Sequence, residues 1–176
     1  MTSFIDSDEY GIIGNLISSG IEVHTIKYPR NQKSITGKLS SGILNVRPMI
    51  QHLKGEEPFF FAKYKSKKMA GLISKLIEKT DFDMVQVEYN VMHHYTEQIG
   101  NIPKLIVFHD VSTKGYERGK DQGNPRNQKL FEMAIKLEPE IANKFDAVIT
   151  LTEEDKEYLS NLGCESEIKV IPPQIN

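Results

Sequence analysis

The sequence has one cysteine, no long apolar run and almost no net charge, and each of these shortages excludes a class of function. Because Cys164 stands alone, an intramolecular disulfide is impossible and a zinc site built from cysteines is disfavoured. No stretch approaches the roughly 18 apolar residues that cross a membrane. With 22 Lys and Arg against 24 Asp and Glu, overall basicity does not point to nucleic acid.

The opening residues also lack the apolar segment of a secretory signal peptide. Asp6, Asp8 and Glu9 stand where that segment would lie, so we expect a cytoplasmic protein. The chain has 176 residues, of which 39% are hydrophobic and 26% charged. This is enough for one domain with its own core and too little for two large ones, so we expect a single domain over residues 1–176.

The small net charge conceals an uneven distribution. Residues 24–68 contain ten Lys and Arg but two acids, a net charge of +8, and the rest of the chain carries −10. The segment is either a solvated lysine-rich face or a surface for anionic lipid or a phosphorylated ligand.

Helical and strand patterns alternate along the chain. Apolar residues at helical spacing predict helices at residues 12–17, 39–53, 69–77, 91–99, 130–141 and 153–162. Short apolar or alternating runs predict strands at residues 21–26, 84–89, 105–108, 147–151 and 168–171, and an extended segment at 59–61. Such alternation predicts an α/β fold, a Rossmann-like three-layer sandwich with a mostly parallel sheet.

Local signals refine some of these boundaries. Asp6 and Glu9 resemble a capping box for the first helix, and Gly20 supplies a left-handed residue at its end. Pro48 is expected to kink or split its helix. Residues 118–127, rich in Gly, Asn and Pro, are expected to form a loop.

Polar residues follow the predicted parallel strands, where such sheets bind ligands. They are Glu88, Tyr89 and Asn90, then His109, Asp110 and Ser112, then Thr152 and Glu153. This pattern predicts a binding crevice at the carboxyl edge of the sheet.

Each candidate also has a structural interpretation. His109 is either a base or hydroxyl ligand near neutral pH, or a histidine bonded to a loop carbonyl. Glu88 is a ligand, a helix cap or an ion-pair partner, and Thr152 is most simply a helix cap. His93 and His94 do not predict a metal site, because adjacent histidines on a helix point in different directions. No Walker loop or dinucleotide fingerprint appears, so we expect no cofactor.

Three stretches in order resemble the amino-terminal half of bacterial family-4 glycosyltransferases, which have the two-domain GT-B architecture. They are residues 14–23, 82–89 and 105–110. The match extends to Glu138, which stands eight residues before Asp146, and to the final Val-Ile-Pro-Pro at 170–173. The closest likeness is to sugar transferases of exopolysaccharide and capsule synthesis. The resemblance implies transfer of a sugar from a nucleotide sugar to a hydroxyl acceptor, with no required metal.

The resemblance also implies roles for residues. His109 matches the family histidine at the end of this strand and would contact the transferred sugar or the reacting hydroxyl. Arg118 would hold an acceptor phosphate, or is a solvated arginine. Family members begin with a strand and continue into a second, donor-binding domain, so we expect this chain to be the acceptor-side domain without its first strand and donor half, and inactive alone.

Two other functions stay open. The chain could be a non-catalytic subunit that recruits a partner or membrane, or a degenerate glycosyltransferase-like domain; a weaker hypothesis is a nucleotide-binding regulatory domain. The expected partners are a nucleotide-sugar donor and a hydroxyl acceptor, either free or lipid-linked. Residues 24–68 would then contact an anionic membrane peripherally at its cytoplasmic face.

Overall fold

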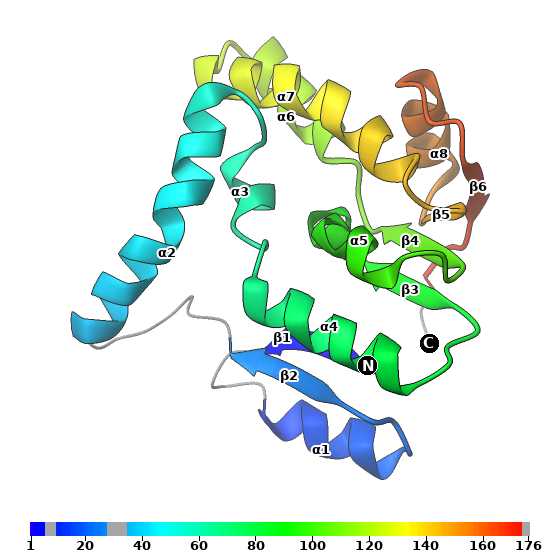
Figure 1. The fold of residues 1–176 in the computed structure, drawn as a ribbon. Helices are drawn as coiled ribbons and strands as arrows, with labels where there is room; N and C mark the ends of the chain where they lie inside the picture. The colour runs from blue at the N-terminus through cyan, green and yellow to red at the C-terminus, as the bar shows by residue number, and fades with distance from the viewer. Residues whose placement is uncertain (6–9, 28–34, 174–176) are drawn as a thin grey trace.

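A computed structural model describes residues 1–5, 10–27 and 35–173, and it confirms the α/β fold (Figure 1). Within these residues the strands form two parallel sheets. In the larger sheet, β3 (Val85–Glu88), β4 (Lys104–Phe108), β5 (Ala147–Thr150) and β6 (Glu167–Val170) lie side by side in sequence order. All carboxyl ends in this sheet therefore meet at one edge, which is the geometry that a Rossmann-like crevice requires.

The smaller sheet corrects the expectation that the chain lacks a first strand. β1 (Thr2–Ile5) precedes α1 (Tyr10–Ser18) and pairs in parallel with β2 (His24–Lys27). The strand is too short, and too polar at Thr2 and Ser3, to give an alternating pattern, yet Ile5 is buried. The capping box at Asp6 and Glu9 lies outside the described residues. Gly20 ends the first helix with a φ of 82°, as predicted.

The remaining helices include the predicted ones, in the predicted order with shifted ends. They are α2 (Ile35–Lys54), α3 (Phe59–Ala62), α4 (Lys67–Lys79), the 3₁₀ helix η2 (Asn90–Tyr95), α5 (Thr96–Ile99), α6 (Ser112–Asp121), α7 (Pro125–Ala142) and α8 (Glu153–Asn161). Of these, α3 and α6 were not predicted as helices. α2 runs on through Pro48, so of the predicted kink or split, the split is wrong. The Thr152 hydroxyl accepts from the Asp155 N–H at 3.0 Å, which confirms it as the α8 cap.

Two predictions of irregular structure were wrong. Residues 59–61 form helix α3 instead of an extended segment, because Pro58 starts a turn whose carbonyl accepts from the Phe61 and Ala62 N–H groups. Most of residues 118–127 is helical as well. Pro125 stands at a first helical position, where a missing N–H is no loss, and the Asn124 side chain caps α7.

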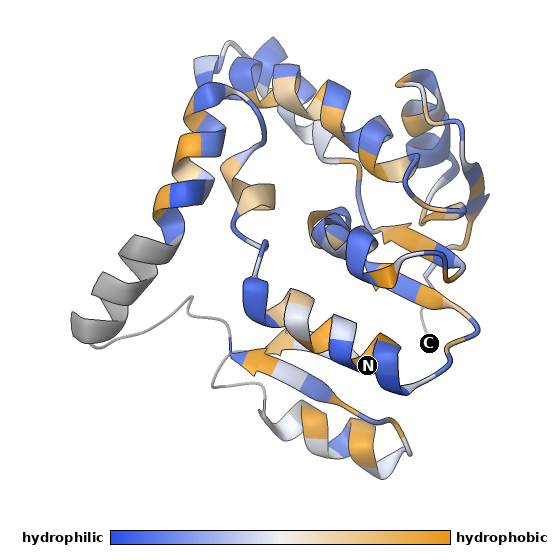
Figure 2. Ribbon diagram, in the orientation of Figure 1, coloured by the Kyte–Doolittle hydropathy of each residue, from blue (hydrophilic) through white to orange (hydrophobic). Residues whose placement is uncertain are grey.

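The core lies around the central strands of the larger sheet. Ile106 and Phe108 of β4 and Val148 of β5 have no exposed surface, and Ile141 of α7 and Leu159 of α8 pack into the same cluster. Figure 2 shows β4 as largely hydrophobic, whereas α7 carries both hydrophobic and hydrophilic residues along its length. None of the helices in the described ranges is long and apolar enough to cross a membrane.

Candidate functional site

Glu88 and His109 meet at the carboxyl edge of the larger sheet. Glu88 is the last residue of β3, and His109 directly follows the neighbouring strand β4. The His109 Nε2 lies 2.7 Å from the Glu88 Oε2, and both side chains are partly exposed. The carboxylate therefore orients the imidazole while leaving the pair open to a ligand. Gln86 donates a hydrogen bond to the other oxygen of Glu88.

Tyr89 stacks on His109 and has an unusual backbone. Its φ is 69°, and among the described residues it is the one non-glycine residue with a positive φ. Its ring stacks on the His109 imidazole, with centroids 4.0 Å apart and planes inclined by 17°. Side chains other than glycine reach this backbone region only at a cost of order 1–3 kcal/mol, and such strain concentrates at functional sites.

Glu138 holds together the two loops that carry these residues. Its side chain is fully buried on α7 and accepts from the Ser112 and Thr113 N–H groups at 2.9 Å each, and from the Asn90 amide at 2.7 Å. The carboxylate thus takes the place of a cap on α6 and also binds the residue that starts η2. Burial raises the pKa of Glu138, and the donated hydrogen bonds oppose this rise.

The pair opens into a cavity between the two sheets. The cavity has a volume of about 1010 Å³ and is lined by β1, β3 and the apolar face of α4. Predicted site residues at its wall are Glu88, Tyr89, Asn90, His109, Asp110 and Ser112. This size matches a small-molecule site, and the polar groups gather where the strands end.

Arg118, Thr152 and Glu153 do not line this cavity. Arg118 projects from α6 as an exposed residue instead of lying in a loop. Thr152 is occupied as the α8 cap, and Glu153 is an exposed residue in the first turn of that helix. Near them, Lys114 of α6 forms ion pairs with Asp155 and Glu154 of α8, each at 2.8 Å. A role for these three residues would need a ligand that extends beyond the cavity.

The expectation that His93 and His94 diverge was wrong. Their Nε2 atoms lie 3.1 Å and 3.5 Å from the same oxygen of Glu57, and the ring centroids are 4.0 Å apart. Burial lowers the pKa of His93 to about 3 and that of His94 to about 4, so both rings are neutral near pH 7. Among the described residues, this group is the one whose atoms could hold a metal ion.

Sequence reasoning missed two contacts that organise these sites. Glu138 entered only as part of a family resemblance, although a glutamate within the apolar stripe of Met133, Ala134 and Ile141 is itself a signal of a buried carboxylate. Glu57 gave no signal, because it lies beside Glu56 in a charged segment.

The parallel sheets, the covering helices and the polar carboxyl edge define a Rossmann-like domain of the GT-B class of glycosyltransferases. The sequence model of the protein family Glycosyltransferase Family 4 matches residues 10–176, so the chain belongs to this family. Neither the curated proteins nor the solved structures yield a match to the chain.

Proposed function

We propose that this domain binds the acceptor in a glycosyltransferase that moves a sugar from a nucleotide sugar to a hydroxyl group. Membership in the family supports the reaction class. The observation that carries the assignment of the site is the Glu88–His109 pair, which lies at the wall of a cavity at the carboxyl ends of β3 and β4. A glycosyl acceptor needs a group that binds and aligns its reacting hydroxyl.

The hydrogen bond to Glu88 defines what His109 can do. When a neutral imidazole donates its Nε2–H to the carboxylate, its Nδ1 remains as the proton acceptor. This nitrogen accepts the hydrogen bond of an acceptor hydroxyl and takes its proton as the oxygen attacks the anomeric carbon. The bond from that carbon to the nucleoside diphosphate breaks, and the diphosphate leaves with the electron pair.

The charge that develops on the departing diphosphate must be stabilised by other groups. By family resemblance, we assign these stabilising groups to a second Rossmann-like domain that binds the nucleotide sugar. We assign the sugar-transfer reaction to the two-domain protein as a whole. Closure of the two domains over the cavity would exclude water, which competes with the acceptor. Arg118, Thr152 and Glu153 then serve an acceptor that extends past Asp110.

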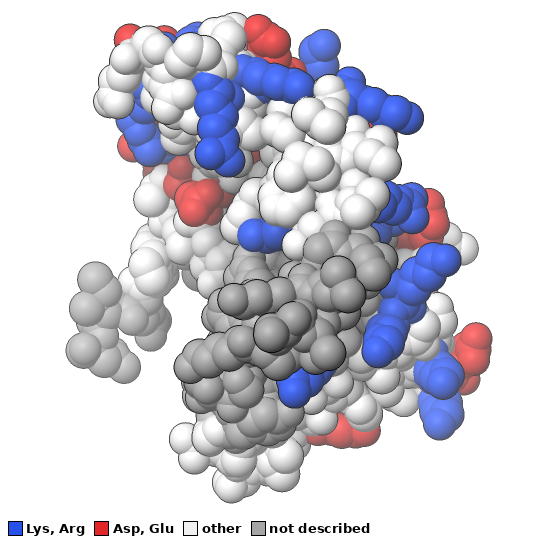
Figure 3. All heavy atoms as spheres, turned by 90° about the vertical axis from the view of Figure 1, so that its left-hand side faces the viewer, with Lys and Arg blue, Asp and Glu red and all other residues white. Residues whose placement is uncertain are grey.

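The acceptor class that fits best is a lipid-linked precursor of a surface polysaccharide. An exposed apolar stripe on α2 supports contact with a membrane: Val46, Met49, Ile50 and Leu53 are 45–66% exposed. Arg47 and Lys54 flank it on the same helix. Figure 3 shows Lys and Arg in several separate groups on this side of the molecule, and they do not form a single basic patch. The apolar stripe therefore carries this part of the proposal.

The test is transfer by the two-domain protein with His109→Ala and His109→Gln. We expect turnover to fall about 10²–10⁴-fold, as when a general base is removed, with the melting temperature little changed. His52→Gln is the matched control, because His52 lies on α2 and does not line the cavity. Turnover per folded molecule that stays at the wild-type value would contradict the role of His109.

A second measurement tests the division between domains. Calorimetric titration of the 176-residue chain with uridine, guanosine and thymidine diphosphate sugars is expected to show no tight binding. Micromolar affinity for one of them would place the donor site in this domain and overturn the assignment. A two-domain protein with no transferase activity would instead favour the alternative of a recruiting subunit.

A further inference from the structure

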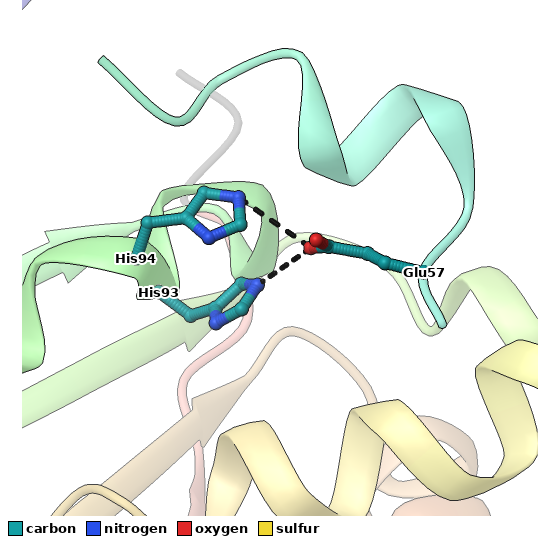
Figure 4. A group of neighbouring side chains, drawn as sticks. All are labelled: Glu57, His93 and His94. Carbon is teal, nitrogen blue, oxygen red and sulfur yellow. Dashed lines mark hydrogen bonds and ion pairs between the residues drawn. The ribbon is translucent and has the colours of Figure 1, made fainter. Parts of the chain in front are cut away.

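Glu57, His93 and His94 form a buried cluster from two segments that lie far apart in the sequence. Glu57 immediately precedes Pro58 and helix α3, whereas both histidines belong to η2. Figure 4 shows the two rings turned toward one carboxylate. The side chains of Glu57, His93 and His94 are only 9%, 8% and 3% exposed.

Two of the three spacings between the polar atoms match a tetrahedral metal site. Bonds of 2.0–2.1 Å to zinc at tetrahedral angles place neighbouring ligand atoms about 3.3–3.4 Å apart. The two nitrogen-to-oxygen distances are 3.1 Å and 3.5 Å, and one ligand atom from each residue lies within 4.8 Å of the others. The site therefore needs only small adjustments to place an ion between the three groups.

We propose that Glu57, His93 and His94 bind one divalent ion of the zinc class. Two imidazoles and one carboxylate are a recurrent zinc ligand set, and nitrogen ligands favour zinc over magnesium and calcium. Three protein ligands leave the fourth position to a water molecule, and burial leaves little room for a substrate, so we assign the site a structural role. It fastens the segment before α3 to η2, which directly follows Tyr89.

The chemistry of the cluster without an ion supports this assignment. Two imidazoles and a carboxyl group have been removed from water, which costs free energy unless strong partners replace the water. Both Nε2 atoms already face the Glu57 carboxylate, so the ligand atoms converge on one point before an ion is bound (Figure 4). A bound cation would satisfy all three groups together.

Two features of the surroundings oppose metal binding and lower the expected affinity. The His94 Nε2 also lies 3.0 Å from the Phe61 carbonyl, so ligation would move the ring proton to Nδ1 and release that hydrogen bond. Lys65 and Lys144 add positive charge near the site. Both lysines are exposed, so solvent screens their repulsion of the ion.

Metal binding is measured on the whole chain after treatment with a chelator. Zinc is titrated in competition with a chromophoric chelator, and cobalt is titrated separately to record the visible absorption of a four-coordinate ion. We expect one zinc per chain and a higher melting temperature with zinc. Magnesium and calcium at the same concentration are expected to have no such effect.

Variants then assign the ligands. Glu57→Gln, His93→Gln and His94→Gln should each weaken zinc binding by more than the roughly 10–100-fold that loss of an outer contact costs. His24→Gln is the control, since His24 also contacts a glutamate, Glu22 at 2.8 Å, but belongs to no group of three potential metal ligands among the described residues. We expect this control to bind zinc as the wild type does.

A wild-type chain without stoichiometric zinc binding overturns the proposal. The proposal is also overturned if the three variants bind zinc as tightly as the wild type, or if His24→Gln loses as much zinc affinity as they do. If a variant does not fold, the cobalt spectrum of the wild-type chain decides, because four-coordinate cobalt absorbs visible light far more strongly than the hydrated ion. These outcomes do not depend on whether the proposed transferase function holds.

Discussion

Glu138 accepts hydrogen bonds from both the backbone N–H and the hydroxyl of Thr113, at 2.9 Å and 2.5 Å, and neither residue has any exposed surface. The contact joins α7 to the first turn of α6. Because α6 follows His109 and Asp110, one buried carboxylate fixes the position of the loop that carries the proposed base.

Glu138→Gln is expected to destabilise the fold by about 1–3 kcal/mol, because its amide nitrogen cannot accept hydrogen bonds and leaves buried donors without a partner. Chemical denaturation measures this change. The control is Glu140→Gln on the same helix, where the side chain is exposed and the stability should be unaffected. Equal stability of the two variants would show that the Glu138 carboxylate does not organise the loop.

Tyr89→Gly is expected to be more stable than Tyr89→Ala. Both changes remove the ring that stacks on His109, so their difference isolates the backbone. Relief of the positive φ outweighs the greater freedom that glycine gives the unfolded chain, for a net gain of about 1 kcal/mol. Urea denaturation of both variants checks this, and a more stable Tyr89→Ala would exclude strain at this position.

Lys114 provides a pH test of the contact between α6 and α8. Burial lowers the pKa of Lys114, but hydrogen bonds from its ammonium group to Asp155 and Glu154 more than reverse this, so its pKa lies above 10.5. The folded state therefore holds the proton more tightly than the unfolded state. The stabilisation is fully present below pH 10.5 and is lost as pH rises through the raised pKa.

Urea denaturation of the wild type and of Lys114→Met measures the stabilisation that the protonated Lys114 contributes, as the difference between their free energies of unfolding. We expect it to be constant between about pH 7 and pH 9, and to shrink above the ordinary lysine pKa of about 10.4. A difference that grows with rising pH would contradict the direction of the shift.

Leu53→Asp is expected to reduce sedimentation with anionic vesicles while leaving the fold intact, because Leu53 is 66% exposed on the apolar stripe of α2. Ile171→Asp is the matched control, since Ile171 is 54% exposed and lies after β6. Binding should also weaken as salt rises, because basic residues on α2 contribute to it. Equal, negligible sedimentation with anionic and neutral vesicles at low salt would exclude membrane contact by this domain.

The rule that parallel strands share a carboxyl edge placed Glu88 and His109 in one region from sequence alone. Their actual contact follows because β3 and β4 are neighbours in the sheet. The same rule gave Thr152 and Glu153, which follow β5, but they lie outside the cavity wall. Arg118 was assigned to a loop because Gly119 and Asn124 looked like breakers, whereas they lie within and just before well-formed helices.

Local chemistry determined much of this protein without tertiary information. The alternation of strands and helices, the α8 cap at Thr152 and the helix end at Gly20 depend on residues within a few positions of one another. Tertiary structure alone decided that Glu57 meets His93 and that Glu138 meets Asn90, across 36 and 48 residues. The cost of a buried polar group depends on the partners that folding brings to it, and those partners leave no pattern in the nearby sequence.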